Sequence, residues 1–86
     1  MFFVYILRTS ANTLYVGQTN NLERRIKQHR KGKNASAKYL RYFSSLELVY
    51  SEKYKTRKEA MHRERELKRW PRVKKQALIT DGFINL

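Results

Sequence analysis

The chain has 86 residues, and we expect residues 1–86 to form one small domain with a modest core. It contains no cysteine, which excludes disulfides and thiolate metal sites. Lys and Arg number 20 against 7 Asp and Glu, giving a formal net charge of +13. This charge predicts a nucleic-acid partner, because neutralising phosphates releases counterions. An anionic membrane surface is disfavoured, because no single predicted helix shows a broad apolar face of Trp, Phe and Leu.

The opening residues favour a β-hairpin. Residues 2–8 (FFVYILR) are β-branched and aromatic, and residues 14–18 (LYVGQ) repeat that pattern after the turn-forming TSANT. MFFVYIL has no basic leader and is shorter than the roughly 20 apolar residues of a membrane span. We therefore expect no signal peptide, no membrane association and a cytoplasmic protein.

A helix is predicted next, capped by Asn20, with Glu23 completing a pattern like a capping box. Leu22, Ile26 and His29 share one of its faces, and Gly32 is a plausible end. A basic connection over residues 33–45 leads to a strand over residues 46–52. A helix then runs from about Thr56 to about Trp70.

Pro71 fits either a kink or the first turn of a last helix over residues 72–80. The element order is thus ββαβαα. Three strands with helices packed on them predict an α/β or α+β fold.

The position of Glu64 in its predicted helix is unusual for a charged surface residue. At about 100° per residue, Glu64 falls within the stripe that contains Ala60 and Leu67, whereas Glu66 falls on the far side. A carboxylate facing the core needs a partner. Glu64 therefore forms either a structural ion pair with an arginine or part of a functional site.

Four further side chains raise the same question. Arg25 flanks the apolar stripe of its helix and His29 lies on it, so both can be structural residues. Alternatively, Arg25 binds a phosphate, and His29 relays protons or positions a phosphate. Tyr5 and Tyr15 lie within the hairpin strands, where tyrosine is common. An even-sum pairing or a bulge would place both on one face, and the sequence alone does not fix that register.

These features, in this order, resemble the GIY-YIG nuclease family, and more narrowly its small stand-alone bacterial members, the UPF0213 group. The matching segments are Phe3-Val4-Tyr5, Tyr15-Val16-Gly17, Asn21-Leu22-Glu23-Arg24-Arg25 and Glu59-Ala60-Met61-His62-Arg63-Glu64. The first motif has Phe3 where the family name has glycine.

The resemblance implies a three-stranded antiparallel sheet flanked by helices, and metal-dependent cleavage of phosphodiester bonds. It implies catalytic positions at Tyr5, Tyr15, Arg25, His29 and Glu64. Glu64 would hold a single Mg²⁺ or Mn²⁺, and one tyrosine would act as the base, with Tyr15 our first choice.

The expected function is an endonuclease acting on DNA, selective for structure or single strands, in repair, recombination or processing, with no small-molecule cofactor. Candidate nucleic-acid contacts beyond the site are Lys38, Tyr39, Arg41 and Lys68. The alternatives are a nucleic-acid-binding module with weak or no catalysis, and a basic face that docks an acidic protein. The sequence does not indicate the oligomeric state.

Overall fold

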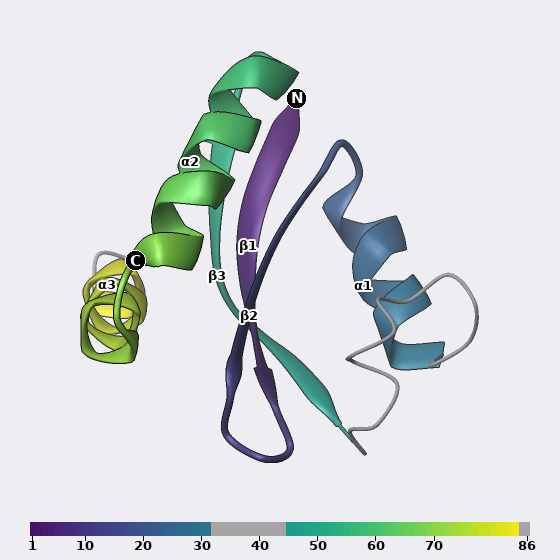
Figure 1. Ribbon diagram of the computed structural model, residues 1–86. Coiled ribbons are helices and arrows are strands. Elements are labelled where there is room, and N and C mark those ends of the chain that lie inside the picture. Colours follow the sequence, from purple (N-terminus) through teal and green to yellow (C-terminus); the bar gives the residue numbers. More distant parts are fainter. Residues whose placement is uncertain (32–44, 85–86) are drawn as a thin grey trace.

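The computed structural model describes residues 1–31 and 45–84, and its elements follow the predicted order ββαβαα (Figure 1). The strands are β1 (Phe2–Thr9), β2 (Leu14–Thr19) and β3 (Leu46–Tyr54). The helices are α1 (Leu22–Lys31), α2 (Arg57–Arg69) and α3 (Arg72–Ile84). The fold is α+β, as predicted. Within the described residues, no helix has the length and apolar character needed to cross a bilayer.

The sheet is antiparallel with strand order β2-β1-β3. The central strand β1 is apolar on both faces, with Val4, Tyr5, Ile6 and Leu7 almost completely buried. The predicted turn between β1 and β2 is confirmed. Asn12 adopts φ 62° there, a conformation that asparagine tolerates, and the Thr9 amide donates to the Thr13 carbonyl over 2.9 Å.

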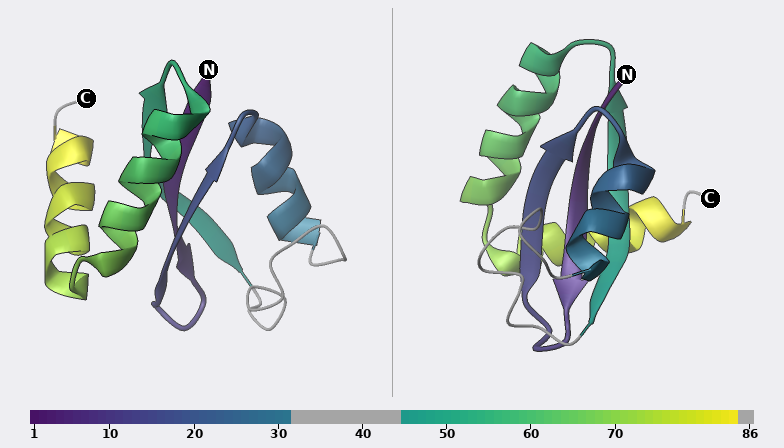
Figure 2. Two further views of the ribbon diagram at one scale, coloured as in Figure 1. Left: turned by 45° about the horizontal axis from the view of Figure 1, so that its top comes forward. Right: turned by 90° about the vertical axis from the view of Figure 1, so that its right-hand side faces the viewer.

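Helices cover both faces of this sheet (Figures 1 and 2). Under α2 and α3, the side chains of Val4, Ile6 and Val16 pack with those of Ala60 and Leu67. A second cluster lies under α1 on the other face and is built on Tyr5, Leu7 and Ile26, with Tyr15, Leu22 and Leu46 packed around it. Successive residues of β1 therefore alternate between two cores.

The cap of α1 corrects one prediction, because Asn21 and not Asn20 caps the helix. The Asn21 Oδ1 atom accepts a hydrogen bond from the Arg24 amide over 3.0 Å. Strand β2 continues to Thr19, whose hydroxyl oxygen accepts from the Asn21 amide over 3.2 Å. This turn sets the helix start one residue later than expected. The other differences are longer elements: β3 reaches Tyr54, and α3 reaches Ile84.

The start and end of α2 follow the sequence closely. Thr56 is the N-cap, and its side chain accepts from the Glu59 amide over 3.2 Å. Trp70 has an extended backbone, as expected for a residue before proline. The Pro71 carbonyl accepts from the Lys74 amide over 3.1 Å. Pro71 therefore starts a new helix and does not kink a continuous one.

The carboxylate of Glu52 attaches α2 to β3. It accepts hydrogen bonds from the hydroxyls of Tyr50 and Tyr54 and from Arg63, whose Nε lies 3.0 Å from Oε1 and whose Nη2 lies 3.1 Å from Oε2. Arg63 is also within cation–π range of the Trp70 ring, 5.0 Å from its centroid. Because Arg63 precedes Glu64, this network fixes the turn of α2 that carries Glu64.

Candidate active site

The register of the hairpin brings the two tyrosines together. Leu7 pairs with Tyr15, and Tyr5 pairs with Gly17, so the sums are even and all four residues face α1. Tyr5 is 1% exposed, whereas Tyr15 is half-buried. The question left open by the sequence is thus answered by the pairing of β1 with β2, without a bulge between these strands.

Gly17 leaves the space that the Tyr5 ring occupies. A Cβ atom at position 17 would lie 2.5 Å from the Tyr5 Oη and 2.6 Å from its Cζ. These separations are shorter than any side chain tolerates. The absence of a side chain at Gly17 therefore lets the Tyr5 ring lie against β2, where its hydroxyl reaches His29.

His29 meets both tyrosines from α1. It is 2% exposed, and its Nε2 lies 2.9 Å from the Tyr5 Oη. Its ring meets the Tyr15 ring edge-on, at 69° and 5.9 Å between centroids. Among the described residues, its Nδ1 is buried without a hydrogen-bond partner. Burial, and then the charge of Arg25, lower the pKa of His29 to about 4. His29 is therefore neutral at physiological pH.

Arg25 lies one turn before His29 on α1. Its Nη1 donates to the Gln28 Oε1 over 3.2 Å, and its guanidinium also hydrogen-bonds Tyr5. Burial raises the pKa of Tyr5, while the hydrogen bond and charge of Arg25 oppose that rise; burial is the larger effect. Tyr5 therefore stays protonated at neutral pH in the free protein.

Glu64 approaches this group from α2, on the opposite face of the sheet. Its charge is one of those that raise the pKa of Tyr5, which places the carboxylate within electrostatic reach of the tyrosine. Its side chain is 21% exposed, and the Lys68 Nζ lies 3.3 Å from its Oε2. The predicted inward position is thus confirmed. Among the described residues, the ion-pair partner of Glu64 is a lysine on its own helix and not an arginine from another element.

Most of the chain matches a known domain. The family model described as the GIY-YIG catalytic domain matches residues 1–77, which include all five predicted catalytic positions. This chain belongs to the GIY-YIG family. It is therefore a member of a nuclease superfamily, and a nucleic acid is the implied substrate.

Similar GIY-YIG chains carry the name UPF0213. A UPF0213 protein of Natronomonas pharaonis is 42% identical, covering 92% of this chain and 91% of the relative. One of Clostridium perfringens is 44% identical, covering 98% and 88%. The solution NMR structure of a UPF0213 protein from Bacillus halodurans has a TM-score of 0.59 at 38% identity, covering 93% and 84%. These names specify no activity.

The donor set around Glu64 fits one type of divalent ion. Within residues 1–31 and 45–84, no three His, Cys, Asp or Glu side chains form a cluster that could hold a metal alone. Mg²⁺ usually keeps several waters and takes one or two carboxylates plus phosphate oxygens from its substrate. A single half-buried carboxylate is compatible with such an ion, so Glu64 fits the expected metal ligand.

The predicted nucleic-acid contacts fall into two groups. Lys38, Tyr39 and Arg41 lie outside the described residues, and their role stays a prediction. Lys68 lies on α2, exposed over 54% of its side chain and paired with Glu64. It is therefore close to the candidate site and not a remote surface lysine.

The sequence alone does not predict two contacts of this site. The motif that contains Gly17 is visible in the sequence, but the contact of Gly17 with Tyr5 depends on the strand register. The second contact is the hydrogen bond by which Gln28 orients Arg25, and Gln28 is not among the site residues predicted from the sequence. Its position three residues after Arg25 on one helix is the signal that could have identified it, because side chains at that spacing are neighbours.

Proposed function

We propose that this chain is a divalent-metal-dependent endonuclease that hydrolyses phosphodiester bonds in DNA. The observation that supports this most strongly is the gathering of Tyr5, Tyr15, Arg25 and His29 between the hairpin and α1, with Tyr5 within electrostatic reach of Glu64. The basic charge of +13 supports a polyanionic substrate. We further propose structure or single-strand selectivity, in repair, recombination or processing, because so small a domain has little room for a sequence-reading element.

Arg25 binds the scissile phosphate in this proposal. A guanidinium presents a planar set of donors that matches two phosphate oxygens, and its charge stabilises the negative charge that grows in the transition state. The bond to Gln28 fixes the orientation of Arg25 on α1. Gln28 is therefore a positioning residue.

Tyr15 is the base in this proposal. Tyr5 is 1% exposed, its hydroxyl is engaged with His29, and burial raises its pKa, all of which disfavour it as the group that meets water. Tyr15 is half-buried and keeps an accessible edge. Its phenolate takes a proton from water as the water oxygen bonds to phosphorus and the bond to the leaving sugar oxygen breaks; that oxygen is then protonated from solvent.

His29 and Tyr5 hold the Tyr15 ring in place. The neutral imidazole packs edge-on against Tyr15 and is fixed by its hydrogen bond to Tyr5. A neutral imidazole also adds no positive charge that would compete with Arg25 for the phosphate. Tyr5 and His29 thus act through the position of Tyr15.

Glu64 would hold a single Mg²⁺ or Mn²⁺. Such an ion, when bound, stabilises negative charge on the leaving oxygen. The half-buried position of Glu64 limits its hydration and keeps its carboxylate oriented.

The test is incubation of purified wild-type and Glu64→Ala protein with labelled single-stranded, duplex and branched DNA, with Mg²⁺, with Mn²⁺ and with chelator. We expect cleavage by the wild type only, and only with metal. Tyr15→Phe should lose cleavage by a larger factor than Tyr5→Phe. Equal cleavage by wild type and Glu64→Ala would indicate a contaminant and remove support for the proposal.

A nucleic-acid-binding module without catalysis is the second candidate. The observation that favours it is the ion pair between Lys68 and Glu64, which occupies the carboxylate that a metal would need. Salt-dependent DNA binding without cleavage by either protein in the same experiment would select this alternative.

A further inference from the structure

A polar hollow of about 290 Å³ lies beside the candidate active site, between the end of β2 and the first turns of α1. Every residue that lines it is polar: Gln18, Thr19, Asn20, Asn21, Arg24, Arg25 and Gln28. A hollow without apolar lining is poorly suited to an apolar side chain or ligand. The arginine and amide N–H groups that line the hollow favour a bound anion. Arg25 belongs both to this hollow and to the candidate active site.

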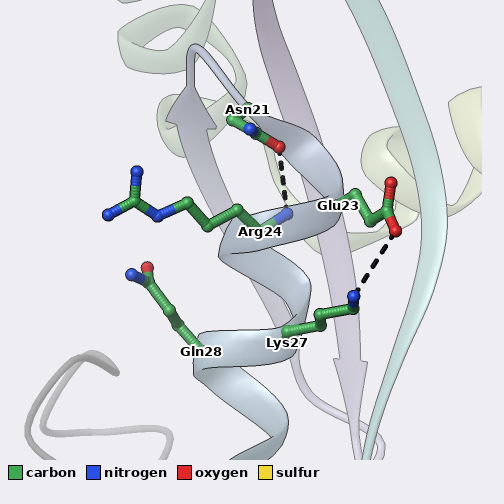
Figure 3. Close-up of a pocket in the computed structure, with 5 residues that line it drawn as sticks. All are labelled: Asn21, Glu23, Arg24, Lys27 and Gln28. Atoms are coloured by element: carbon green, nitrogen blue, oxygen red, sulfur yellow. Dashed lines mark hydrogen bonds and ion pairs between the residues drawn. The ribbon is translucent and has the colours of Figure 1, made fainter.

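Arg24 supplies an uncompensated charge to this hollow. Its side chain is exposed, and the structure shows no ion pair or side-chain hydrogen bond between Arg24 and any other described residue. In Figure 3, Arg24 and Gln28 extend to one side of α1, while Glu23 and Lys27 extend to the other. Glu23 therefore neutralises Lys27, at 3.5 Å, and not Arg24.

Gln28 adds a neutral donor between the two arginines. Its Oε1 accepts from Arg25, so the amide nitrogen keeps its two N–H donors for another partner. Gln28 and Arg24 also border a second hollow on the outer side of α1, of about 390 Å³ (Figure 3). The two side chains therefore stand between open spaces that a flexible chain can enter.

We propose that Arg24 and Gln28 bind the backbone phosphate next to the scissile one on the same nucleic-acid strand. This inference rests on the proposed function, because it takes the scissile phosphate to be bound at Arg25. An adjacent phosphate on the strand then meets Arg24, the preceding residue of α1. Arginine suits this contact because its planar donors engage two phosphate oxygens. The site reads the backbone and not the bases, which agrees with a substrate chosen by shape.

The experiment compares Arg24→Gln with Lys27→Gln, two variants that remove one charge from neighbouring turns of the same helix. Binding of a labelled single-stranded oligonucleotide is measured by fluorescence anisotropy over a series of salt concentrations, with chelator present so that no cleavage occurs. The logarithm of the binding constant falls linearly with the logarithm of the salt concentration, and each lost phosphate contact on single-stranded DNA makes this dependence shallower by about 0.7. We expect this loss, with weaker binding, for Arg24→Gln and almost none for Lys27→Gln.

Equal losses in the two variants would overturn the proposal, because they would mean that only net charge matters. So would polyglutamate binding as tightly as DNA with the same dependence on Arg24, since the hollow would then prefer acidic polypeptides. Far-ultraviolet circular dichroism checks that both variants fold. Because no cleavage is measured, the result is separate from the nuclease test: an inactive wild type whose binding still depends on Arg24 would remove the proposed activity and keep this site.

Discussion

The Tyr5 ring occupies the place where a side chain at Gly17 would stand. The two residues are cross-strand partners, and a Cβ on Gly17 would lie 2.5 Å from the Tyr5 Oη. Tyr5 in turn reaches His29, 24 positions further along the chain. The glycine on β2 therefore determines how the tyrosine on β1 meets the helix.

Gly17→Ala should destabilise the protein. In an ordinary strand, alanine is favoured over glycine by roughly 0.5–1 kcal/mol. Here the added methyl group overpacks a buried ring, for which the typical cost is about 1–3 kcal/mol. We expect a lower free energy of unfolding in urea, together with weaker DNA cleavage because the Tyr5–His29 contact shifts.

The same substitution in a Tyr5→Leu background provides the control. With the ring removed, Gly17→Ala should become neutral or stabilising, and the double-mutant cycle then measures the coupling. An unchanged penalty in that background would show that the cost arises elsewhere in β2.

The free energy of unfolding should decrease as the pH is lowered, because His29 is buried in its neutral form. Its pKa in the folded protein is about 4, below the ordinary value of 6.5, so the unfolded chain binds more protons between these values. The histidine has no effect above pH 6.5, and it progressively destabilises the fold as the pH falls towards 4. The total loss is up to about 3 kcal/mol.

Urea unfolding of wild type and His29→Gln at several pH values between 7 and 4 measures this effect. The variant should lack this part of the pH dependence. His62→Gln, at the exposed second histidine, controls for the loss of an imidazole. A pH profile of His29→Gln that matches the wild type would contradict the assignment.

Glu52→Gln should loosen α2. Although burial raises the pKa of Glu52, hydrogen bonds from Arg63 and the two tyrosines outweigh it, and the pKa lies below the ordinary value. Loss of the charge weakens these bonds and should cost about 1–3 kcal/mol in the free energy of unfolding at pH 7. Because the folded-state pKa is lowered, this stabilisation exists above the ordinary carboxyl pKa and disappears as the pH falls through the folded value.

Chemical denaturation of Glu52→Gln beside Glu47→Gln tests that role. Glu47 is exposed and lies on the same strand, so its variant should stay within about 0.5 kcal/mol of the wild type. Similar losses in both variants would mean that the network around Arg63 adds nothing to the attachment of α2 to β3.

Local patterns predicted most of the fold. The strands over residues 2–8 and 14–18 and the helix that starts near Thr56 each depend on nearby chemistry, and the structure confirms them. Pro71 left two possibilities open, and the structure selects the start of a new helix. Asn20 and Asn21 are two candidate caps of the same type. The choice between them depends on where β2 ends, which local propensity does not fix.

The candidate site divides in the same way. Helical periodicity alone placed Glu64 on the inward stripe of α2 and Glu66 outside it. In contrast, the common face of Tyr5 and Tyr15 depends on a pairing between strands, and the Gly17 contact depends on that register. A one-residue slip would have placed the two tyrosines on opposite faces without changing any local pattern.

Lys68→Met should tighten the binding of Mn²⁺. In the free protein the Lys68 ammonium lies 3.3 Å from the Glu64 carboxylate, so a metal that uses this carboxylate has to displace it. An exposed ion pair of this kind contributes about 0.2–1 kcal/mol, and its removal should strengthen metal binding by up to about fivefold. Isothermal titration of Mn²⁺ into the metal-free protein measures the affinity directly, without DNA or cleavage.

Two further variants make the Mn²⁺ titration specific. Glu64→Ala should abolish the binding, which shows that the measured site is the predicted one. Lys58→Met removes an equal charge from an exposed position of α2, beside Glu59 and His62. If Lys58→Met tightens Mn²⁺ binding as much as Lys68→Met, net charge explains the change. Lys68 then does not compete with the metal for Glu64.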